Sequence, residues 1–388
     1  MIKQYIKIAQ CYFIRCVLKL GYIFPIKKNR LLFNAYSGKG ITCNPKYIYL
    51  KLYEKYDDKL EYVWCLNNDN FDNELPGSII AVKPNSLRFI YYVLTSKIYI
   101  NNGIAPSYIP FRSSQCVIGT WHGGGAYKKG GLDTNSSWEN ERILSLVASN
   151  VTYTLSSCKS FDNVLKNAFK IPPQKILHLG LPRNDIFFNT NKDIVIEIKK
   201  KLKIKTNVNV VLYAPTFRSD LTGIEHNFHA GDYTLNYAET IKSLKHRFGG
   251  EWIFMFRSHY YLSGITLPDN VIDVSDYEDM QELLLVSDVL INDYSSSMWD
   301  FSLMKKPCFI FAPDAEKYIK ERSFYTPISE WPFPIANTNQ QLQENICSFN
   351  YENYLVAVKK HHANLGSYEQ GTASQKVCEI IKSRMEEK

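Results

Sequence analysis

Short apolar runs alternate along the chain with longer segments in which apolar residues recur every three or four positions. A short run bounded by turn residues is typical of a buried strand, and the longer spacing is typical of a helix that buries one face. This alternation predicts an α/β fold in which parallel sheets carry helices on both faces. The predicted strands are 31–35, 62–66, 78–82, 97–100, 116–119, 151–155, 176–179, 208–214, 252–256, 271–272, 289–291 and 308–313.

Helices are predicted between these strands. Asn44 and Pro45 are expected to begin a helix that runs to about Tyr56, because asparagine caps helices and proline fits their first turn. Other helices are expected after Ser86, up to Ala148, after Ser160, around 280–284, at 192–205 and 298–304, and within 367–384.

With 388 residues, the chain is long for one hydrophobic core, so two domains are expected. The lysine-rich helix at 192–205 is interpreted as a linker, and it lacks the interleaved aromatic residues of a nucleic-acid site. The predicted divisions are a basic segment at 1–30, Rossmann-like domains at 31–195 and 196–365, and a C-terminal helix at 366–388 that could cross back to the first domain.

The net charge of +8 is concentrated at the start of the chain, where the first thirty residues carry seven basic side chains and no acidic one. Basic residues interrupt the apolar positions too often for a membrane-spanning helix, and no signal-peptide cleavage site is present. The pattern favours an amphipathic helix on an anionic membrane surface. A helix packed on the core with a solvated basic edge is the alternative.

Nine cysteines are scattered along the chain without a CxxC pair or a Cys/His spacing suited to zinc. An odd, dispersed set is typical of reduced cysteines in a cytoplasmic protein. Together with the basic start of the chain, this predicts a peripheral protein on the cytoplasmic face of the membrane.

The strand at 116–119 leads into Thr120, Trp121 and His122, which three glycines follow. A histidine on a loop at the end of a strand is well placed to act as a general base. Glycines there allow a close approach to a ligand. A structural histidine is the alternative interpretation.

A second strand, 289–291, ends in Asn292-Asp293-Tyr294 and three serines, Ser295 to Ser297, before a helical pattern begins at Met298. The first N–H groups of a helix lack internal partners, so serine hydroxyls beside them can form a phosphate seat. The alternative is that Ser295 simply caps the helix.

Other strand ends in the second half also carry polar side chains: Thr216 and Arg218, Arg257 and His259, and Asp314. Arginine binds phosphate as a bidentate fork, and histidine can donate to phosphate oxygens. Several such residues at the ends of strands in one sheet indicate a nucleotide-diphosphate pocket.

Taken together, these residues resemble one family, the CDP-glycerol glycerophosphotransferases of teichoic acid and capsule polymer synthesis. The similarity covers roughly residues 31 to 384. The motifs that carry it are Trp121-His122-Gly123, Leu181-Pro182-Arg183-Asn184-Asp185, Tyr213-Ala214-Pro215-Thr216-Phe217-Arg218, Arg257-Ser258-His259, Val274-Ser275-Asp276-Tyr277, Asp293-Tyr294-Ser295-Ser296 with Asp300, and Gln370-Gly371-Thr372-Ala373-Ser374.

The resemblance implies a GT-B fold, in which two Rossmann-like domains face a cleft, with an N-terminal amphipathic helix that docks on membrane lipid. It also implies transfer of glycerol phosphate or ribitol phosphate from a CDP-alditol to a hydroxyl of a lipid-linked or capsular glycan acceptor, with release of CMP. Under this interpretation the catalytic residues are His122, as base, and His259. The donor-binding residues are Thr216, Arg218, Arg257, Asp293, Ser295, Ser296 and Ser297, and the acceptor-side residues are Gly123, Gly124 and Lys128.

Asp293 has two alternative roles at this stage, which are to orient His259 or to fix its own turn. No Asp-x-Asp triplet is present; its nearest approach, Asp69 and Asp72, is interpreted as a solvated loop. No metal site is predicted, although a magnesium ion bridging the donor phosphates is compatible with the sequence.

The chain departs from the family pattern at two places. The loop after Gly123 is Gly124-Gly125-Ala126-Tyr127, where the family usually has Thr-Pro before a lysine, and Phe217 stands where tryptophan is common.

Two other functions are kept open: a nucleotide-sugar-dependent GT-B glycosyltransferase and a non-catalytic membrane-binding module.

Overall fold

The computed structural model describes residues 2–68, 75–189, 192–216, 235–258, 267–321 and 323–387. The chain divides into two compact units. The first unit contains Met1–Gly123, Gly130–Asp185 and Ser367–Lys388, and the second unit contains Gly124–Lys129 and Ile186–Gly366.

The division between the units falls after Asp185, whereas the sequence placed it after residue 195. The lysine-rich helix therefore belongs to the second unit. The C-terminal segment from Ser367 belongs to the first unit, and the short segment Gly124–Lys129 belongs to the second although the residues around it belong to the first.

The first unit is built on a sheet of seven strands in the order β3-β2-β1-β4-β5-β6-β7, and all neighbouring strands are parallel. Its central strand, β1, is buried on both faces at Leu31, Leu32 and Phe33, as expected for a strand covered by helices on both sides. The strands are β1 (Lys27–Asn34), β2 (Glu61–Cys65), β3 (Ile79–Val82), β4 (Ser96–Asn101), β5 (Cys116–Gly119), β6 (Tyr153–Ser156) and β7 (Ile176–His178).

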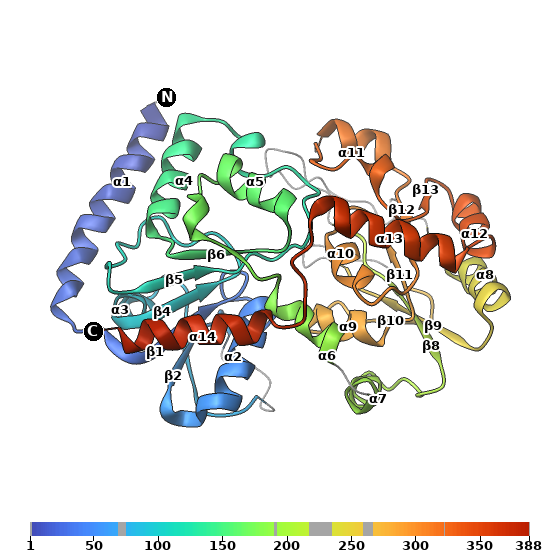
Figure 1. Cartoon of the computed structure of the whole chain (residues 1–388), viewed down its shortest axis with the longest axis horizontal. Coiled ribbons are helices and arrows are strands. Elements are labelled where there is room, and N and C mark those ends of the chain that lie inside the picture. The colour runs from blue at the N-terminus through green and yellow to red at the C-terminus, as the bar shows by residue number, and fades with distance from the viewer. Residues whose placement is uncertain are drawn as a thin grey trace. The chain divides into compact units, whose positions relative to one another are not determined.

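Six α-helices of the first unit are described, together with short 3-10 helices (Figure 1). The α-helices are α1 (Ile2–Leu18), α2 (Cys43–Tyr56), α3 (Leu87–Thr95), α4 (Trp138–Asn150), α5 (Lys159–Ala168) and α14 (Ala373–Glu386). The 3-10 helices are Lys19–Ile23, Asp57–Lys59, Gly131–Asp133, Pro173–Lys175 and Pro182–Asp185.

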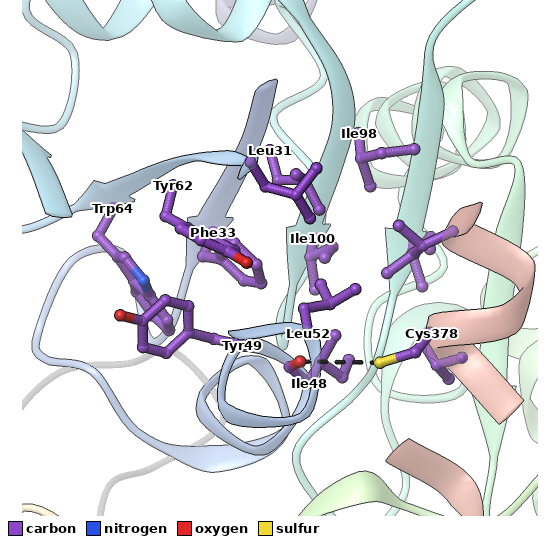
Figure 2. Packing of buried hydrophobic residues seen from close by; sticks show 14 of the residues in the cluster. Leu31, Phe33, Ile48, Tyr49, Leu52, Tyr62, Trp64, Ile98, Ile100 and Cys378 are labelled. Atoms are coloured by element: carbon purple, nitrogen blue, oxygen red, sulfur yellow. Dashed lines mark hydrogen bonds between the residues drawn. The ribbon is translucent and has the colours of Figure 1, made fainter. Parts of the chain in front are cut away.

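Alternate residues of the strands feed two separate hydrophobic clusters. Leu31 and Phe33 pack with α2 and α14, whereas Leu32 packs with α3 and α4. Figure 2 shows the first cluster, in which the thiol of Cys378 on α14 approaches the carbonyl of Ile48 on α2. Because each buried leucine or phenylalanine stabilises the fold by roughly 1.5–3 kcal/mol, the first cluster, which includes Val377 and Ile381, fixes α14 on the first unit.

The second unit repeats this arrangement with six parallel strands in the order β10-β9-β8-β11-β12-β13. The strands are β8 (Asn209–Tyr213), β9 (Trp252–Phe256), β10 (Val271–Asp273), β11 (Val289–Asn292), β12 (Cys308–Phe311) and β13 (Ile335–Ala336). The described helices are α6 (Ile186–Asn189), α7 (Lys192–Lys201), α8 (Tyr237–Phe248), α9 (Met280–Val286), α10 (Ser297–Ser302), α11 (Ala315–Glu321), α12 (Asn339–Cys347), α13 (Tyr351–Leu365) and the 3-10 helix Ile328–Glu330.

The predicted fold class is therefore confirmed: each unit is a parallel α/β sheet with helices. In both sheets the strand order runs outward in two directions from the centre, as in Rossmann folds. The order reverses between β1 and β4 in the first unit and between β8 and β11 in the second.

One predicted helix start was displaced. Helix α2 begins at Cys43, and Thr42 occupies the capping position with no side-chain capping bond. Asn44 lies inside the first turn and is fully buried. Its side chain is used elsewhere in the first unit, as described below.

The N-terminal segment forms helix α1, and part of it packs on the first unit. The ring of Tyr5 lies 4.6 Å from that of Trp138 on α4, and Arg15 donates to the carbonyl of Ile109 at 2.8 Å. The helix and the turn after it nevertheless leave large apolar side chains exposed, including Phe13 and Leu20. Among the described residues, no helix is both long and apolar enough to cross a membrane.

Candidate active site

In the first unit, the loops that follow β1, β4 and β5 meet where the strand order reverses. Tyr36, after β1, donates its backbone N–H to the side-chain oxygen of Asn102, after β4, at 2.8 Å. The ring of His122, on the loop after β5, lies 5.8 Å from that of Tyr36. The predicted base therefore lies at the carboxyl edge of the sheet, where α/β folds usually bind their ligands.

One hydrogen bond sets the tautomer of His122. Its Nδ1 lies 2.8 Å from the backbone oxygen of Asn102, and because a carbonyl oxygen can only accept, Nδ1 carries the proton. In the neutral ring the lone pair is then on Nε2. The side chain of His122 keeps part of its surface in contact with solvent although the groups packed around it reduce its hydration, and this arrangement suits removal of a proton from a bound hydroxyl by Nε2.

The surroundings of His122 also favour its neutral form. Reduced hydration lowers the pKa of His122 below its ordinary value of 6.5, the hydrogen bond to Asn102 opposes this, and the positive charge of Arg183 lowers the pKa further. The lowered pKa shifts the imidazole towards its uncharged form at neutral pH, as a general base requires.

The residue before the histidine has an unusual backbone conformation. Trp121 has a φ of +57°, a region that costs a residue with a large side chain roughly 1–3 kcal/mol. Its ring stacks on His122 at 4.9 Å and meets Phe169 edge to face at 4.9 Å. Such a conformation persists only where neighbouring groups hold the chain.

In the second unit, Asp293 joins the loops after β8 and β11. One carboxylate oxygen accepts from the backbone N–H of Thr216 at 2.8 Å, and the other accepts from the Thr216 hydroxyl at 2.5 Å and from the backbone N–H of Tyr294. Asp293 is buried, and these contacts fix the turn, which was one of its two predicted roles. Its other predicted partner, His259, lies outside the described residues.

The three serines lie directly before and within α10. The N–H of Ser297 donates to the hydroxyl of Ser295 at 3.3 Å, and the side chain of Asn292 donates to the carbonyl of Ser295 at 2.8 Å. Ser296 is the capping residue, but its hydroxyl makes no capping bond. The turn is therefore held by Ser295 and Asn292, and the capping position is Ser296 and not Ser295.

Arg257 and Ser258 are held by the Val274–Tyr277 motif. Arg257 donates to the carbonyl of Tyr277 at 2.5 Å, and the N–H of Ser258 donates to the hydroxyl of Ser275 at 2.9 Å. This motif therefore supports the loop after β9 from the neighbouring strand. Arg218 and Phe217, like His259, lie outside the described residues.

Two of the predicted acceptor-side residues, Gly124 and Lys128, pack inside the second unit, whereas Gly123 belongs to the first. A Cβ on Gly124 would lie 1.9 Å from Cδ1 of Trp299, a fully buried side chain of α10. The ammonium of Lys128 lies 5.4 Å from the centre of the Tyr318 ring. The glycine at 124 is thus required by packing against Trp299.

The same segment is anchored along its length. Thr326 donates to the carbonyl of Ala126 at 2.7 Å, and the N–H of Tyr325 donates to the carbonyl of Tyr127 at 2.6 Å. The phenol of Tyr127 lies 2.8 Å from Nε2 of His361, whose burial lowers its pKa to about 4. The loop Gly124–Tyr127, which departs from the family pattern, is therefore an ordered part of the second unit.

No group of three or more histidine, cysteine, aspartate or glutamate side chains suited to a metal ion occurs in the described part of the chain. The residues present near His122 are instead amides, a guanidinium and aromatic rings.

Sequence reasoning missed the residues that support His122. Asn44 was interpreted as a helix cap and Arg183 only as part of a motif, yet both bind the backbone of the loop that carries the histidine. Asn102 was not noted. Since each acts through contacts between residues far apart in the chain, local patterns carried no signal for them.

A profile of the family described as CDP-Glycerol:Poly(glycerophosphate) glycerophosphotransferase matches residues 16–383. The chain is 30% identical over 391 residues to the teichoic acid poly(glycerol phosphate) polymerase of Bacillus spizizenii, a match that covers 94% of this chain and 95% of that protein. It is 29% identical over 390 residues to the Staphylococcus epidermidis protein of the same name, covering 93% of this chain but 52% of that protein. The chain thus spans about half the length of the second relative.

Solved structures of the wall teichoic acid polymerase TagF are also similar. A TagF variant superposes with a TM-score of 0.81 and 26% identity, covering 99% of this chain and 98% of that chain. A TagF variant soaked with CDPG gives the same TM-score and coverage at 25% identity. The match extends through both units, in agreement with the predicted GT-B type of fold.

Replacing Gly124 with alanine tests the packing role of this glycine. The added methyl group would overlap Trp299, which is buried and cannot move aside, so we expect a loss of stability of about 1–3 kcal/mol or more. Gly40→Ala is the matched control, because a Cβ there has no neighbour within 4 Å. Thermal unfolding of the two variants is the measurement; equal midpoints would contradict the packing role.

Proposed function

The chain belongs to the CDP-glycerol:poly(glycerophosphate) glycerophosphotransferase family, and on this premise we propose that it transfers glycerol phosphate from CDP-glycerol to a hydroxyl of a teichoic acid or capsule polymer on a membrane carrier, releasing CMP. Membership makes the chain a transferase of the CDP-alditol type. Glycerol is preferred over ribitol as the transferred alditol, because both relatives described above are named as poly(glycerol phosphate) polymerases.

The observation that carries the proposal is the state of His122. Its Nδ1 donates to the Asn102 carbonyl, which leaves Nε2 unprotonated in the neutral ring, and its pKa is lowered. A histidine in this state can accept a proton at Nε2, because that nitrogen carries the lone pair when the ring is uncharged. It is suited to activating an alcohol acceptor.

In the proposed reaction, the acceptor oxygen attacks the phosphorus that bears glycerol. A new phosphate ester bond forms there, and the bond from this phosphorus to the oxygen bridging it to CMP breaks. The hydroxyl proton passes to Nε2 of His122, and CMP leaves with the bonding electrons. The chain must align the attacking oxygen with the leaving oxygen and balance the negative charge, which are the main requirements of phosphoryl transfer.

Donor binding is assigned to the second unit. Its support is the built turn in which Asp293 fixes Thr216 and in which Ser295 to Ser297 lead into α10. We assign the diphosphate to Thr216, Ser295, Ser296 and Ser297 together with Arg257, Arg218 and His259, of which the last two lie outside the described residues. Arginine and serine groups are the usual partners of phosphate oxygens.

Attachment to the membrane surface is assigned to α1. The helix carries three basic side chains, Lys3, Lys7 and Arg15, and no acidic one. The apolar residues Phe13, Leu20 and Ile23, in the helix and the following turn, are 70%, 73% and 81% exposed. Exposed aromatic and aliphatic groups next to lysines are typical of segments that bind anionic lipid surfaces. These features support a peripheral location for the proposed enzyme, at the membrane that holds its acceptor.

Product analysis tests the reaction itself. The enzyme is offered CDP-glycerol or CDP-ribitol, each with a lipid-linked disaccharide and with a capsule oligosaccharide, and products are identified by mass spectrometry. We expect release of CMP and an acceptor heavier by glycerol phosphate, mainly from CDP-glycerol. Release of CDP, or transfer from a nucleotide sugar with release of UDP, would instead support a glycosyltransferase.

Replacing His122 with alanine tests the base. Turnover should fall about 100-fold or more while the Kd for CDP-glycerol stays nearly unchanged, since the lost group acts in proton transfer. His178→Ala is the control, because His178 is an exposed histidine of the same unit, paired with Asp162 at 3.1 Å. If the His122 variant keeps about a tenth of wild-type turnover, the assignment fails.

Vesicle co-sedimentation tests the role of α1. The protein should bind vesicles that contain anionic lipid better than neutral vesicles, and added salt should weaken this binding. Phe13→Glu should reduce binding about tenfold or more, because burying a phenylalanine contributes roughly 1.5–3 kcal/mol. Val356→Glu on α13, where the valine is 68% exposed, is the control. Equal loss in both variants, or no lipid preference, argues against membrane attachment through α1.

A further inference from the structure

We propose that Arg183 and Asn44 are positioning residues, which form a buried clamp on the backbone of His122 and hold its imidazole ready for proton removal. The inference rests on the proposed function, in which His122 is the base. Both residues lie in the first unit with His122, so every contact in the clamp is internal to that unit.

Asn44 holds the chain on the N-terminal side of His122. Its side-chain nitrogen donates to the carbonyl of Thr120 at 3.1 Å and to that of Trp121 at 2.8 Å. Its side-chain oxygen accepts the backbone N–H of Arg183 at 3.0 Å. One fully buried amide thus joins two segments of the unit and holds the peptide next to the strained φ of Trp121.

Arg183 holds the chain at His122 itself. Its guanidinium donates to the backbone carbonyl of His122 at 2.8 Å and lies 3.5 Å from the sulfur of Cys43. Arg183 is only 5% exposed. A buried guanidinium that is directed at a backbone carbonyl is better suited to holding the loop than to meeting a substrate.

The turn that carries Arg183 is held in place by contacts with the C-terminal segment of the chain. The carboxylate of Glu369 accepts the backbone N–H of Leu181 and the side-chain amide of Asn184, each at 3.0 Å. Asp185 accepts the first N–H groups of α14, from Ala373 at 3.0 Å and Ser374 at 2.7 Å. The turn that carries Arg183 is therefore fixed on both sides.

The charge of Arg183 gives the clamp a measurable signature. Within the described part of the first unit, the groups that face His122 from the neighbouring elements are the phenol ring of Tyr36, the carbonyl of Asn102 and Arg183. Of these, Arg183 is the charged group, and it lowers the pKa of His122. Removing this charge should raise the pKa of His122. The ring would then become protonated at a higher pH, so the loss of activity on acidification should begin at a higher pH than in the wild type.

Two substitutions separate the charge from the geometry. Arg183→Met removes both. We expect turnover to fall at least tenfold, and the acid limb of the profile of kcat/KM against pH to shift to higher pH. Arg183→Lys keeps the charge but cannot reproduce the planar fork, so we expect lower turnover with the acid limb close to that of the wild type. In both, the Kd for CDP-glycerol should stay nearly unchanged.

Arg112 provides matched controls. It lies in the same unit, and its guanidinium donates to the backbone carbonyls of Phe24 and Leu94, each at 2.8 Å. Arg112→Met and Arg112→Lys therefore remove comparable contacts to backbone, and we expect any loss of stability to leave the pH profile unmoved. If these variants move the acid limb as much as the Arg183 variants do, the clamp is overturned.

Nuclear magnetic resonance of labelled histidine gives a readout that does not need turnover. The His122 ring resonance is assigned by its loss in His122→Gln and is titrated in the wild type, Arg183→Lys and Arg183→Met. We expect the proton on Nδ1 in the wild type, and a higher pKa in the methionine variant than in the lysine variant. A titration of the His122 ring that is unchanged in a folded Arg183→Met variant overturns the clamp. If Arg183→Met does not fold, Arg183→Lys decides instead: wild-type turnover together with an unchanged ring signal in that variant also overturns the clamp.

The two hypotheses fail differently. If His122→Ala stays active, the base assignment of the proposed function is wrong, whatever the titration shows. If His122→Ala is inactive but the His122 titration does not respond to Arg183, the proposed function stands and only the clamp is wrong.

Discussion

Each sheet reverses its strand order once, and the chemistry proposed for this protein depends on the groups found there. Between β1 and β4, and again between β8 and β11, the connections that follow the two neighbouring strands lead to opposite sides of the sheet. This leaves a crevice at the carboxyl ends of these strands that is open to a ligand. His122 binds the carbonyl that follows β4, and Asp293 joins the ends of β8 and β11. The same topological feature thus supplies the proposed base in one unit and the proposed donor seat in the other.

The ring of the proposed base is oriented by a neutral group, the carbonyl of Asn102. A carboxylate on Nδ1 would orient the ring equally well, but it would stabilise the imidazolium and raise the pKa. The Asn102 carbonyl orients the ring with a weaker effect, and Arg183 acts in the opposite direction. The result is a weak base that is fully available at neutral pH. A weak base is sufficient where the transition state is loose, because the acceptor proton is removed late and the main tasks are alignment and charge stabilisation.

The sequence predicted the parts of this arrangement that local patterns encode. Strand ends followed by His122, by Asp293 and by the serines could be found because apolar runs and turn residues mark them. The supports could not be found, since Asn44 lies 77 residues from Trp121 and Arg183 lies 61 residues from His122. Gly124 was interpreted as a ligand contact, because a glycine in a loop gives no sign of the side chain packed on it, here Trp299.

The Leu181–Asp185 motif shows why a match to a family pattern does not identify substrate contacts by itself. Arg183 and Asn184 are buried, and Asp185 caps α14. A variant at any of these positions would lose activity, as a variant at a substrate-binding residue would. The physical difference is where the loss originates: a substrate contact changes the free energy of binding, whereas a support changes the orientation or the pKa of the group that reacts. Only a measurement that separates binding from proton transfer can therefore assign a role to each residue of the motif.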